Sequence, residues 1–575
     1  MDVSPETKLY KQSTCSYKSF AGLSQSADGS SPCDFTCDLN EKHDLSHPPK
    51  EIPLREMASG SPNWFDQSLS KPKETDKDCS SQDSLMPLYA ASIIFAIGVT
   101  LALILHIYLG ESLVFVKGVL VSDHERCTSL GQQVLHNHGS SVDAAIAAAL
   151  CLGVVHPHVS GIGGGGVMLV HDIHKNETRV INFQGTAPKT LKEQMLQNVL
   201  QPEAGLQVAV PGMLRGLHHA HCLYGSLSWE DVATRAAAVA KEGFSVSFGL
   251  ADAISKVKGE QLPKRFRAMF FPGGRALRPG SFLRMPSLAG VLEAGVSNFY
   301  DGNFSQEIVD EVRTNGGVLS REDICNYTVE AEQPVEGLYD EFIIKVPPPP
   351  SAGVSVISAL NLLENNNTEN QTYHWIVKSH AEVLRQRTSY SHKTPPMQHS
   401  LQPELQAGQV VVMGPDDLMV SVASSLSRPF GSRLITRSGV ILNSLVLDLS
   451  SPNKTRGQSN QAEERPLSPL SPTLVVPAWH KCGIYMALSS SGAHKSFSTI
   501  TQVLIRALSN HKEKNDSLSL RRLHPPSGLL IDSEFPEESE QLMHQKGHVV
   551  QRVKTNSVVH GIVRIKDTIN TITLP

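Results

Sequence analysis

Residues 140–170 read SSVDAAIAAALCLGVVHPHVSGIGGGGVMLV, and the prediction of the fold starts from this stretch. The alanine-rich run over 141–155 predicts a buried helix, with Ser140 or Ser141 as its N-cap. The segments GVMLVHD and TRVINF predict two paired strands, with the turn IHKNE between them. We therefore expect a helix that leads through glycines into an antiparallel pair of strands.

Five glycines separate the expected helix from the first strand, and Gly161, Gly163 and Gly166 have the spacing GxGxxG of a dinucleotide-binding turn. Such a turn needs a strand before the glycines and a helix after them, because the helix N-terminus holds the pyrophosphate. The order here is reversed. We therefore predict that these glycines bind no nucleotide, and that they permit positive φ angles and close approach of the backbone.

The composition excludes one class of partner. The chain has 575 residues, enough for one large domain with appendages, and its formal net charge is −5. The sequence shows no excess of Lys and Arg. These residues form no cluster, and no array of aromatic residues lies between them. Because nucleic-acid-binding surfaces are basic, we expect no nucleic-acid partner.

A charge-free segment divides the chain. Residues 86–110 contain no Asp, Glu, Lys or Arg, and about 20 apolar residues suffice for a transmembrane helix. The alternative is a buried core helix. Residues 1–85 contain 16 serines and little apolar periodicity, so we expect a disordered tail. Lysines before the span favour a cytoplasmic N-terminus, which makes this a single-pass type II membrane protein with an extracellular or lumenal ectodomain.

Possible modifications agree with that topology. Seven Asn-x-Ser/Thr triplets follow the span and none precedes it, and they begin at Asn176, Asn303, Asn326, Asn366, Asn370, Asn453 and Asn515. Five scattered cysteines also follow the span, so at most two disulfides form in the ectodomain. The segment HHAHC places His218 and His221 on one helix face. No carboxylate nearby completes a zinc site, so we expect neither a metal nor another cofactor.

Several segments resemble one enzyme family. Residues 140–170 are similar to the signature of the gamma-glutamyltransferase (gamma-glutamyltranspeptidase, glutathione hydrolase) family. The same holds for VAVPGMLRGLHHAHCLYGSLSWEDV over 208–232, with its VPG-x-x-RG pattern, and for PPPPSAGVSVISALNLLE over 347–364. It also holds for SSLSRPFGSRLITRSGVILNS over 424–444 and DSEFPEESEQLMHQKGHVV over 532–550. The resemblance extends from about Lys117 to the C-terminus.

The resemblance implies an N-terminal-nucleophile fold, an α/β (α+β) sandwich with four layers in the order αββα. Such a proenzyme cuts itself, and the freed Thr then serves as nucleophile and, through its α-amine, as base. Family members hydrolyse or transfer the gamma-glutamyl group of glutathione. We expect a large-subunit-like part over 111–405 and a small-subunit-like part over 406–575, with glutathione or gamma-glutamyl compounds as ligands if a pocket survives. The sequence leaves the oligomeric state open.

The position of the nucleophile has lost its hydroxyl. The family's Thr opens the strand that here reads PELQAGQVVVMGPDD, so its position falls at Gln406 or Ala407. Neither side chain can attack a carbonyl carbon. Thr394 and Ser400 lie outside the motif, and the segment 380–409 looks several helical turns too short for the family.

The substrate pocket that the resemblance implies is also changed. Gln184 stands where the family has an Arg that clamps the glutamyl α-carboxylate, and Gln supplies neither the charge nor the bidentate fork. Leu445 replaces a Glu of the α-amine pocket, and Pro469 replaces the second serine of a pair. Five further positions remain candidates for binding substrate: Ser425, Ser427, Asp448, Ser468 and Gly492. Gly492 lies beside Ser491 in the expected oxyanion hole.

Three interpretations remain open. In the first, the chain is a working gamma-glutamyl enzyme whose catalytic residues lie at positions other than those assigned above. In the second, it is a catalytically inactive binding or regulatory ectodomain. In the third, it is an aberrant product of an active gene and lacks a segment near 380–409. Nucleophile, carboxylate clamp and amine pocket are altered together. Because a group-transfer enzyme cannot form its covalent intermediate without a nucleophile, we predict lost or much reduced catalysis.

Overall fold

The structure is a computed structural model. It describes residues 86–109, 118–192, 194–197, 203–364, 377–378, 407–448, 468–479, 483–491, 496–509, 523–524, 529–532, 537–547, 549–553, 558–565 and 568–574. All of them belong to the unit Ser46–Pro575. Gln406, Gly492 and the tail 1–85 lie outside the described residues.

One antiparallel sheet contains the strand pair that residues 165–182 predict. Its six strands have the order β1-β9-β10-β2-β3-β6. They are β1 (Val119–Ser122), β9 (Gly408–Met413), β10 (Leu418–Ser425), β2 (Gly165–Asp172), β3 (Glu177–Asn182) and β6 (Glu330–Glu332). The predicted pair β2–β3 is confirmed, with Leu169 opposite Val180. Strand β9 pairs with β10, with Val412 opposite Val420.

A second antiparallel sheet has the order β17-β16-β12-β11-β8-β7. Its strands are β17 (Thr568–Leu574), β16 (Val559–Ile565), β12 (Ile484–Ser490), β11 (Thr473–Pro477), β8 (Phe342–Val346) and β7 (Val335–Tyr339). Each sheet therefore combines strands that precede residue 406 with strands that follow it. The two expected subunit-like parts share one core.

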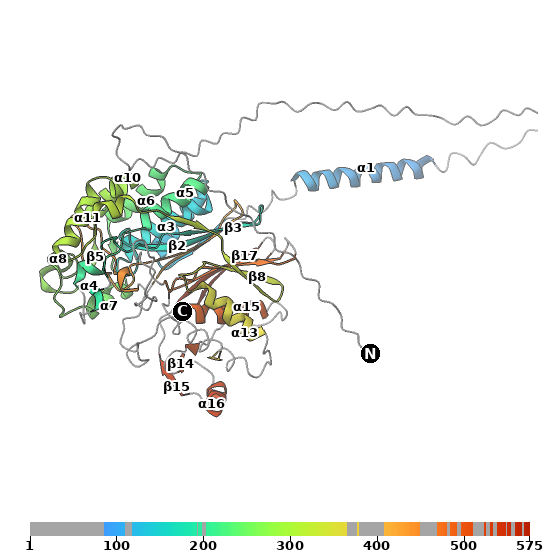
Figure 1. Cartoon of the computed structure of the whole chain (residues 1–575). Helices are drawn as coiled ribbons and strands as arrows, with labels where there is room; N and C mark the ends of the chain where they lie inside the picture. Colours follow the sequence, from blue (N-terminus) through green and yellow to red (C-terminus); the bar gives the residue numbers. More distant parts are fainter. Residues whose placement is uncertain are drawn as a thin grey trace, which may run out of the picture. The chain divides into compact units, whose positions relative to one another are not determined.

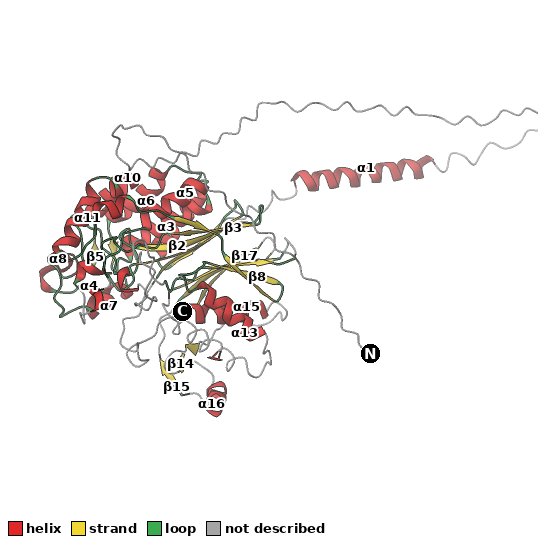
Figure 2. Cartoon of the chain, viewed as in Figure 1, coloured by secondary structure: helices red, strands yellow, loops and turns green. Residues whose placement is uncertain are grey.

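The two sheets pack face to face. Their inner faces form one apolar cluster, in which Leu169 and Val411 of the first sheet accompany Leu474, Ala487 and Ile562 of the second. Alternate residues of each strand point the other way, because side chains of a strand alternate between its faces. Figure 2 shows the two sheets between layers of helices.

Helices cover both outer faces, which completes the order helix, sheet, sheet, helix that the resemblance predicts (Figure 1). The larger layer contains α2 (Glu125–His136), α3 (Ser141–Val155), α5 (Met213–Tyr224), α6 (Trp229–Glu242), α7 (Phe248–Lys256), α8 (Lys264–Phe270), α9 (Pro286–Glu293), α10 (Gly295–Tyr300), α11 (Asn303–Thr314) and α12 (Arg321–Cys325). The smaller layer contains α13 (Gly353–Glu364) and α15 (Ser496–Ser509).

Short elements complete the described chain. They are α4 (Gln194–Gln197), η1 (Ala204–Gln207), β4 (Phe244–Ser245), η2 (Pro272–Gly274), β5 (Phe282–Leu283), η5 (Leu445–Asp448), β13 (Leu523–His524), β14 (Leu529–Asp532), α16 (Glu537–Gln545) and β15 (Val550–Val553). A small third sheet has the order β13-β14-β15.

Helix α3 is buried along its whole length. Ser140 is its N-cap and Asp143 completes a capping box, which decides between the two serines that the sequence left open. Every residue from Ser141 to Val155 is buried, so the helix lies between the first sheet and the outer helices rather than on a surface. The alanines permit this close packing because they add little volume.

The glycines after α3 serve close packing. A Cβ on Gly163 would lie 2.0 Å from the carbonyl oxygen of Ile441, and one on Gly164 would lie 2.5 Å from that of Ser425. Close approach of the backbone is therefore confirmed. The predicted positive φ angles are wrong, because no glycine between Gly161 and Gly166 has one. Gly163 and Gly164 are required because no space is left there for a side chain.

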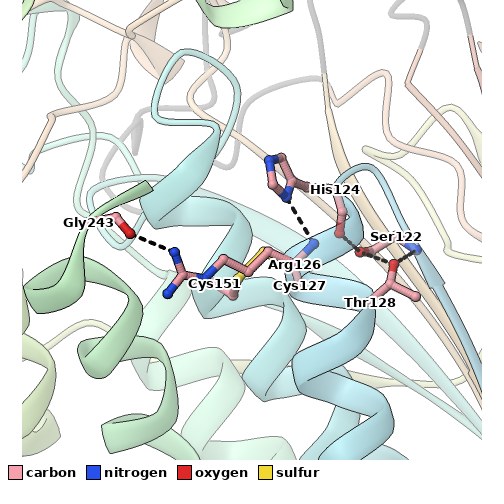
Figure 3. The surroundings of a disulfide bond; sticks show 7 residues. All are labelled: Ser122, His124, Arg126, Cys127, Thr128, Cys151 and Gly243. Atoms are coloured by element: carbon pink, nitrogen blue, oxygen red, sulfur yellow. Dashed lines mark hydrogen bonds between the residues drawn. A yellow bond between two sulfur atoms is a disulfide. The ribbon is translucent and has the colours of Figure 1, made fainter. Parts of the chain in front are cut away.

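A disulfide joins α2 to α3. Cys127 and Cys151 are bonded and fully buried, and their Cα atoms are 5.4 Å apart (Figure 3). Arg126 beside this bridge donates to the carbonyl of Gly243 at 2.6 Å, which connects α2 with the end of α6.

The charge-free segment forms one helix, α1 (Met86–Leu109), of 24 residues. In α1 the structure describes the side chains of residues 89–101, where Ile94 and Phe95 are exposed. Across the described part of the chain, no helix meets the length and apolarity needed to span a membrane.

Candidate functional site

The expected nucleophile position lies at the start of β9. Ala407 precedes this strand and is buried, with its methyl group packed against Ala423 and Leu470. Its backbone N–H donates to the carbonyl of Ser491 at 3.3 Å. Residue 407 therefore has a fixed position between the two sheets, but its side chain has no atom that can attack or transfer a proton.

The beginning of β9 is anchored by a carboxylate that the sequence did not single out. Asp123 accepts the backbone N–H of Gln409 at 2.7 Å. Its other oxygen lies 3.0 Å from Nε2 of His560, on β16 of the second sheet. Asp123 thus links β9 of the first sheet to β16 of the second sheet.

Gln184 lies just beyond the end of β3 and is buried. Its amide nitrogen donates to the hydroxyl of Ser468 at 2.8 Å, so the structure brings together two residues that are 284 positions apart. The residue at the expected carboxylate clamp therefore bonds to the retained serine of the expected serine pair. A neutral amide also lacks the charge and the fork that an arginine offers a carboxylate.

The VPG-x-x-RG motif positions the backbone beside Gln184. A Cβ on Gly212 would lie 2.2 Å from the carbonyl oxygen of Phe183, and one on Gly216 would lie 2.1 Å from the Phe183 Cβ. The motif's two glycines therefore let α5 contact residue 183 directly. Tyr327 completes the arrangement by donating its hydroxyl proton to the Gln184 carbonyl at 2.9 Å.

The arginine of that motif is structural. Arg215 donates to the carbonyls of Cys325 and Tyr327, at 2.9 Å and 2.6 Å. Its guanidinium also lies over the ring of Tyr300, 4.0 Å from the centroid. The motif was recognised in the sequence, but its role depends on these partners about 100 residues away, which no local pattern shows.

The turn η5 carries Leu445 and Asp448. Leu445 is buried in an apolar cluster with Ala187, Leu191, Ala209 and Val446. A Glu at this position would place its carboxylate near these apolar side chains. The expected amine pocket has therefore been partly converted into core.

Asn443 holds this turn in place, and the sequence analysis missed it. Its amide nitrogen donates to the carbonyls of Gly163 and Ala209, at 2.8 Å and 3.0 Å. Its amide oxygen accepts the N–H groups of Ala209 and Leu445, each at 3.0 Å. The residue is fully buried, so one amide joins the glycine run, the loop before α5 and η5. A lone amide within the apolar run VILNSLVL is the signal that pointed to it.

Asp448 lies close to the two serines that the sequence singled out. Burial raises the pKa of Asp448 from 3.8 to about 6, while the Ser427 hydroxyl and the Arg428 charge act in the opposite direction. The Ser427 N–H donates to the Ser425 hydroxyl at 2.9 Å, and Ser427 has a left-handed φ of 73°. Ser425, Ser427 and Asp448 therefore form one polar corner.

Pro469, at the second position of the expected serine pair, has no side-chain hydroxyl. Its backbone carbonyl accepts the hydroxyl proton of Ser496 at 2.9 Å.

The remaining predicted residues are placed as follows. Asn176 is exposed at the β2–β3 turn, Asn326 is exposed at the C-cap of α12, and Asn303 is the first residue of α11. The other sequons lie outside the described residues, as does Gly492. A pocket lined by Thr186, Ala187, Lys189, Val210, Asp323, Asn326, Tyr327, Thr328 and Glu330 lies beside the loop that follows Gln184. It includes neither Ser425 nor Asp448.

One expectation about histidines needs correction. A carboxylate does lie beside His221, because Asp143 Oδ1 is 3.6 Å from its Nε2. The other oxygen of Asp143 accepts the N–H groups of Ser226 and Leu227, so this carboxylate binds the backbone of the loop that follows α5. Within the residues that the structure describes, no group of three or more His, Cys, Asp or Glu side chains is arranged to hold a metal ion.

Comparison with known proteins agrees with this geometry. A family model described as Gamma-glutamyltranspeptidase matches residues 127–407 and 378–573. Glutathione hydrolase 7 of Homo sapiens is 42% identical, with 90% of this chain and 89% of the relative covered. Glutathione hydrolase 5 proenzyme of Rattus norvegicus is 27% identical, with 75% and 86% covered.

Among solved structures, a cephalosporin acylase from Bacillus halodurans has a similar fold. The TM-score is 0.71 at 22% identity, and the similarity covers 80% of this chain and 94% of the acylase. At that identity the match concerns the arrangement of helices and antiparallel sheets.

Proposed function

Because this chain belongs to the gamma-glutamyltranspeptidase family, we propose that it is a membrane-anchored member whose gamma-glutamyl hydrolysis and transfer are lost or much reduced. The observation that carries the proposal is Ala407, a buried methyl group at the start of β9. In an N-terminal-nucleophile enzyme this residue performs both the self-cleavage and the attack on substrate. The chain then acts as an uncut ectodomain that binds or regulates.

The pocket supports the same conclusion independently of the nucleophile. Gln184 donates to Ser468 at 2.8 Å, and Leu445 belongs to an apolar cluster. A glutamyl group would meet no arginine at its α-carboxylate, and at its α-amine only the carboxyl of Asp448. Poor positioning of this kind costs about a hundredfold in rate. Loss of a covalent nucleophile costs of order 10⁴ to 10⁶.

The test is made on the purified full-length chain. An immunoblot against the C-terminus reads self-cleavage, and release of glutamate from glutathione reads hydrolysis. We expect one uncut band and no turnover above background. Ala407→Thr or Gln406→Thr alone restores no activity, because the altered clamp remains.

The matched variant carries Ala407→Thr together with Gln184→Arg, and it should bring back more activity than either change alone. Robust turnover or self-cleavage by the unmodified chain would refute the proposal. That result would show that another hydroxyl, such as Ser400, has taken the role.

We also propose type II insertion through residues 86–110, with the ectodomain extracellular or lumenal and the tail 1–85 in the cytoplasm. The helix α1 and its exposed apolar side chains support the span. The disulfide between Cys127 and Cys151 supports an oxidising compartment for the ectodomain. Asn176 and Asn326 are exposed acceptors for glycans.

Glycosidase treatment of the full-length chain tests the topology. We expect faster migration after treatment, and a smaller shift for Asn176→Gln and for Asn326→Gln. Unchanged mobility together with a cytoplasmic C-terminal tag would contradict type II insertion.

A further inference from the structure

A short region of the ectodomain is strongly basic although the whole chain has a net charge of −5. Residues 258–284 contain one acid, Glu260, and seven Lys or Arg residues, of which Arg265 is partly buried. The six exposed cations, which we call the basic surface, are Lys258, Lys264, Arg267, Arg275, Arg278 and Arg284. The expectation that basic residues form no cluster is wrong here, because chain-wide counts average over this region.

Hydrogen bonds hold the segments of the basic surface together. The Leu277 N–H donates to the Phe270 carbonyl at 3.0 Å, which folds the chain after α8 back onto that helix. The Val246 N–H donates to the Ser281 carbonyl at 2.8 Å, which joins the start of α7 to the same loop. In Figure 1, α7, α8 and β5 lie in one region of the larger helical layer. The cations are thus carried by neighbouring elements.

The scaffold beneath these cations is rigid. Phe266 and Phe270 of α8 are fully buried, and their ring centroids lie 5.1 Å and 4.9 Å from that of Phe430. Two aromatic rings, Phe248 and Phe282, stay exposed at 82% and 59% in the same region. A fixed set of charges binds a polyanion with less loss of conformational entropy than a disordered tail does.

The nearby acids are already neutralised. Asp252 pairs with Lys256 at 2.8 Å, and Glu260 pairs with Arg433. Glu311 pairs with Arg265, the one partly buried cation of the region. Among the described residues, no carboxylate forms an ion pair with any member of the basic surface. Its six charges are therefore available to an external anion.

We propose that the basic surface binds a sulfated polysaccharide at the cell exterior. Four of its six members are arginines, whose planar guanidinium groups bind sulfate oxygens in a bidentate way. The choice of a sulfated sugar rather than an anionic lipid rests on the ectodomain topology proposed above, since the anionic leaflet of the membrane faces the cytoplasm. Spread over several elements, the charges match an extended chain better than a single ion.

The experiment measures binding of the full-length chain, in detergent, to immobilised heparin at 0.15 M salt. The variant Arg267→Gln/Arg275→Gln/Arg278→Gln removes three cations of the basic surface. The control Lys175→Gln/Arg235→Gln/Lys241→Gln removes the same charge from positions that are paired with Asp172, Asp231 and Glu293. We expect the first variant to bind at least about tenfold more weakly, and the control to change by less than about threefold.

Three results would overturn the proposal: no binding by the parent chain at this salt, equal losses in both variants, or tighter binding to phosphatidylserine vesicles than to heparin. Melting temperatures of both variants within about 1 °C of the parent exclude misfolding. Five of the six substituted side chains are exposed, and Arg235 is partly buried. The affinity of the purified protein does not depend on its orientation in the cell. A failure of the glycosidase test therefore remains distinguishable from a failure here.

Discussion

Replacement of Asn443 by Ala probes the amide on which the geometry of the candidate site depends most. Four hydrogen bonds of 2.8–3.0 Å disappear, and three backbone groups lose their partner: the N–H and the carbonyl of Ala209, and the N–H of Leu445. The Gly163 carbonyl keeps a bond from the residue 443 N–H at 3.2 Å. Each buried polar group left unsatisfied costs about 1–2 kcal/mol, so we expect a loss of roughly 3–6 kcal/mol for the three groups.

A thermal scan of the full-length chain measures this effect. An unfolding entropy of roughly 2 cal/mol/K per residue, over the roughly 360 described residues that follow residue 117, converts the loss into a fall in Tm of about 4–8 °C. Scans are compared at one heating rate, since the unfolding of large proteins is commonly irreversible. Asn298→Ala on the exposed face of α10 is the matched control, and its Tm should stay within about 1 °C. An unchanged Tm for Asn443→Ala would refute the view that this amide joins the three segments.

Three further predictions concern single features. Asp448→Asn should raise the Tm at pH 7.5 but not at pH 4: burial raises the pKa of this carboxyl to about 6, so its contribution to stability is present below pH 3.8 and lost as the pH rises through 6. An equal shift at both pH values would contradict this reasoning. Replacing Cys127 and Cys151 by Ser should lower stability by about 3 kcal/mol for a sequence separation of 24, and reduction of the parent should reproduce the change. Ser427→Gly should raise the free energy of unfolding by about 0.5 kcal/mol, and the Tm slightly, because glycine adopts the left-handed φ of 73° without strain. A fall in Tm would show that the contribution of the hydroxyl outweighs the strain.

The sequence alone determined the local elements of this protein. The alanine run predicted α3 with Ser140 or Ser141 as its N-cap, and the segments GVMLVHD and TRVINF predicted β2 and β3. These succeed because helix caps, helical periodicity and strand alternation depend on residues a few positions apart. The family followed from the same stretches together with the VPG-x-x-RG pattern. The absence of a hydroxyl at residue 407 was visible in the strand that opens there.

Only the tertiary structure decided how these parts act together. The bond between Gln184 and Ser468, the role of Asn443 and the link from Asp123 to His560 join positions between 234 and 437 residues apart. The local sequence around each member is compatible with many partners. The glycines after α3 show the same limit, because the predicted positive φ was wrong and the real constraint is the backbone of Ile441 and Ser425. Which groups share a low-dielectric interior is set by the packing of the two sheets, and that packing no local pattern specifies.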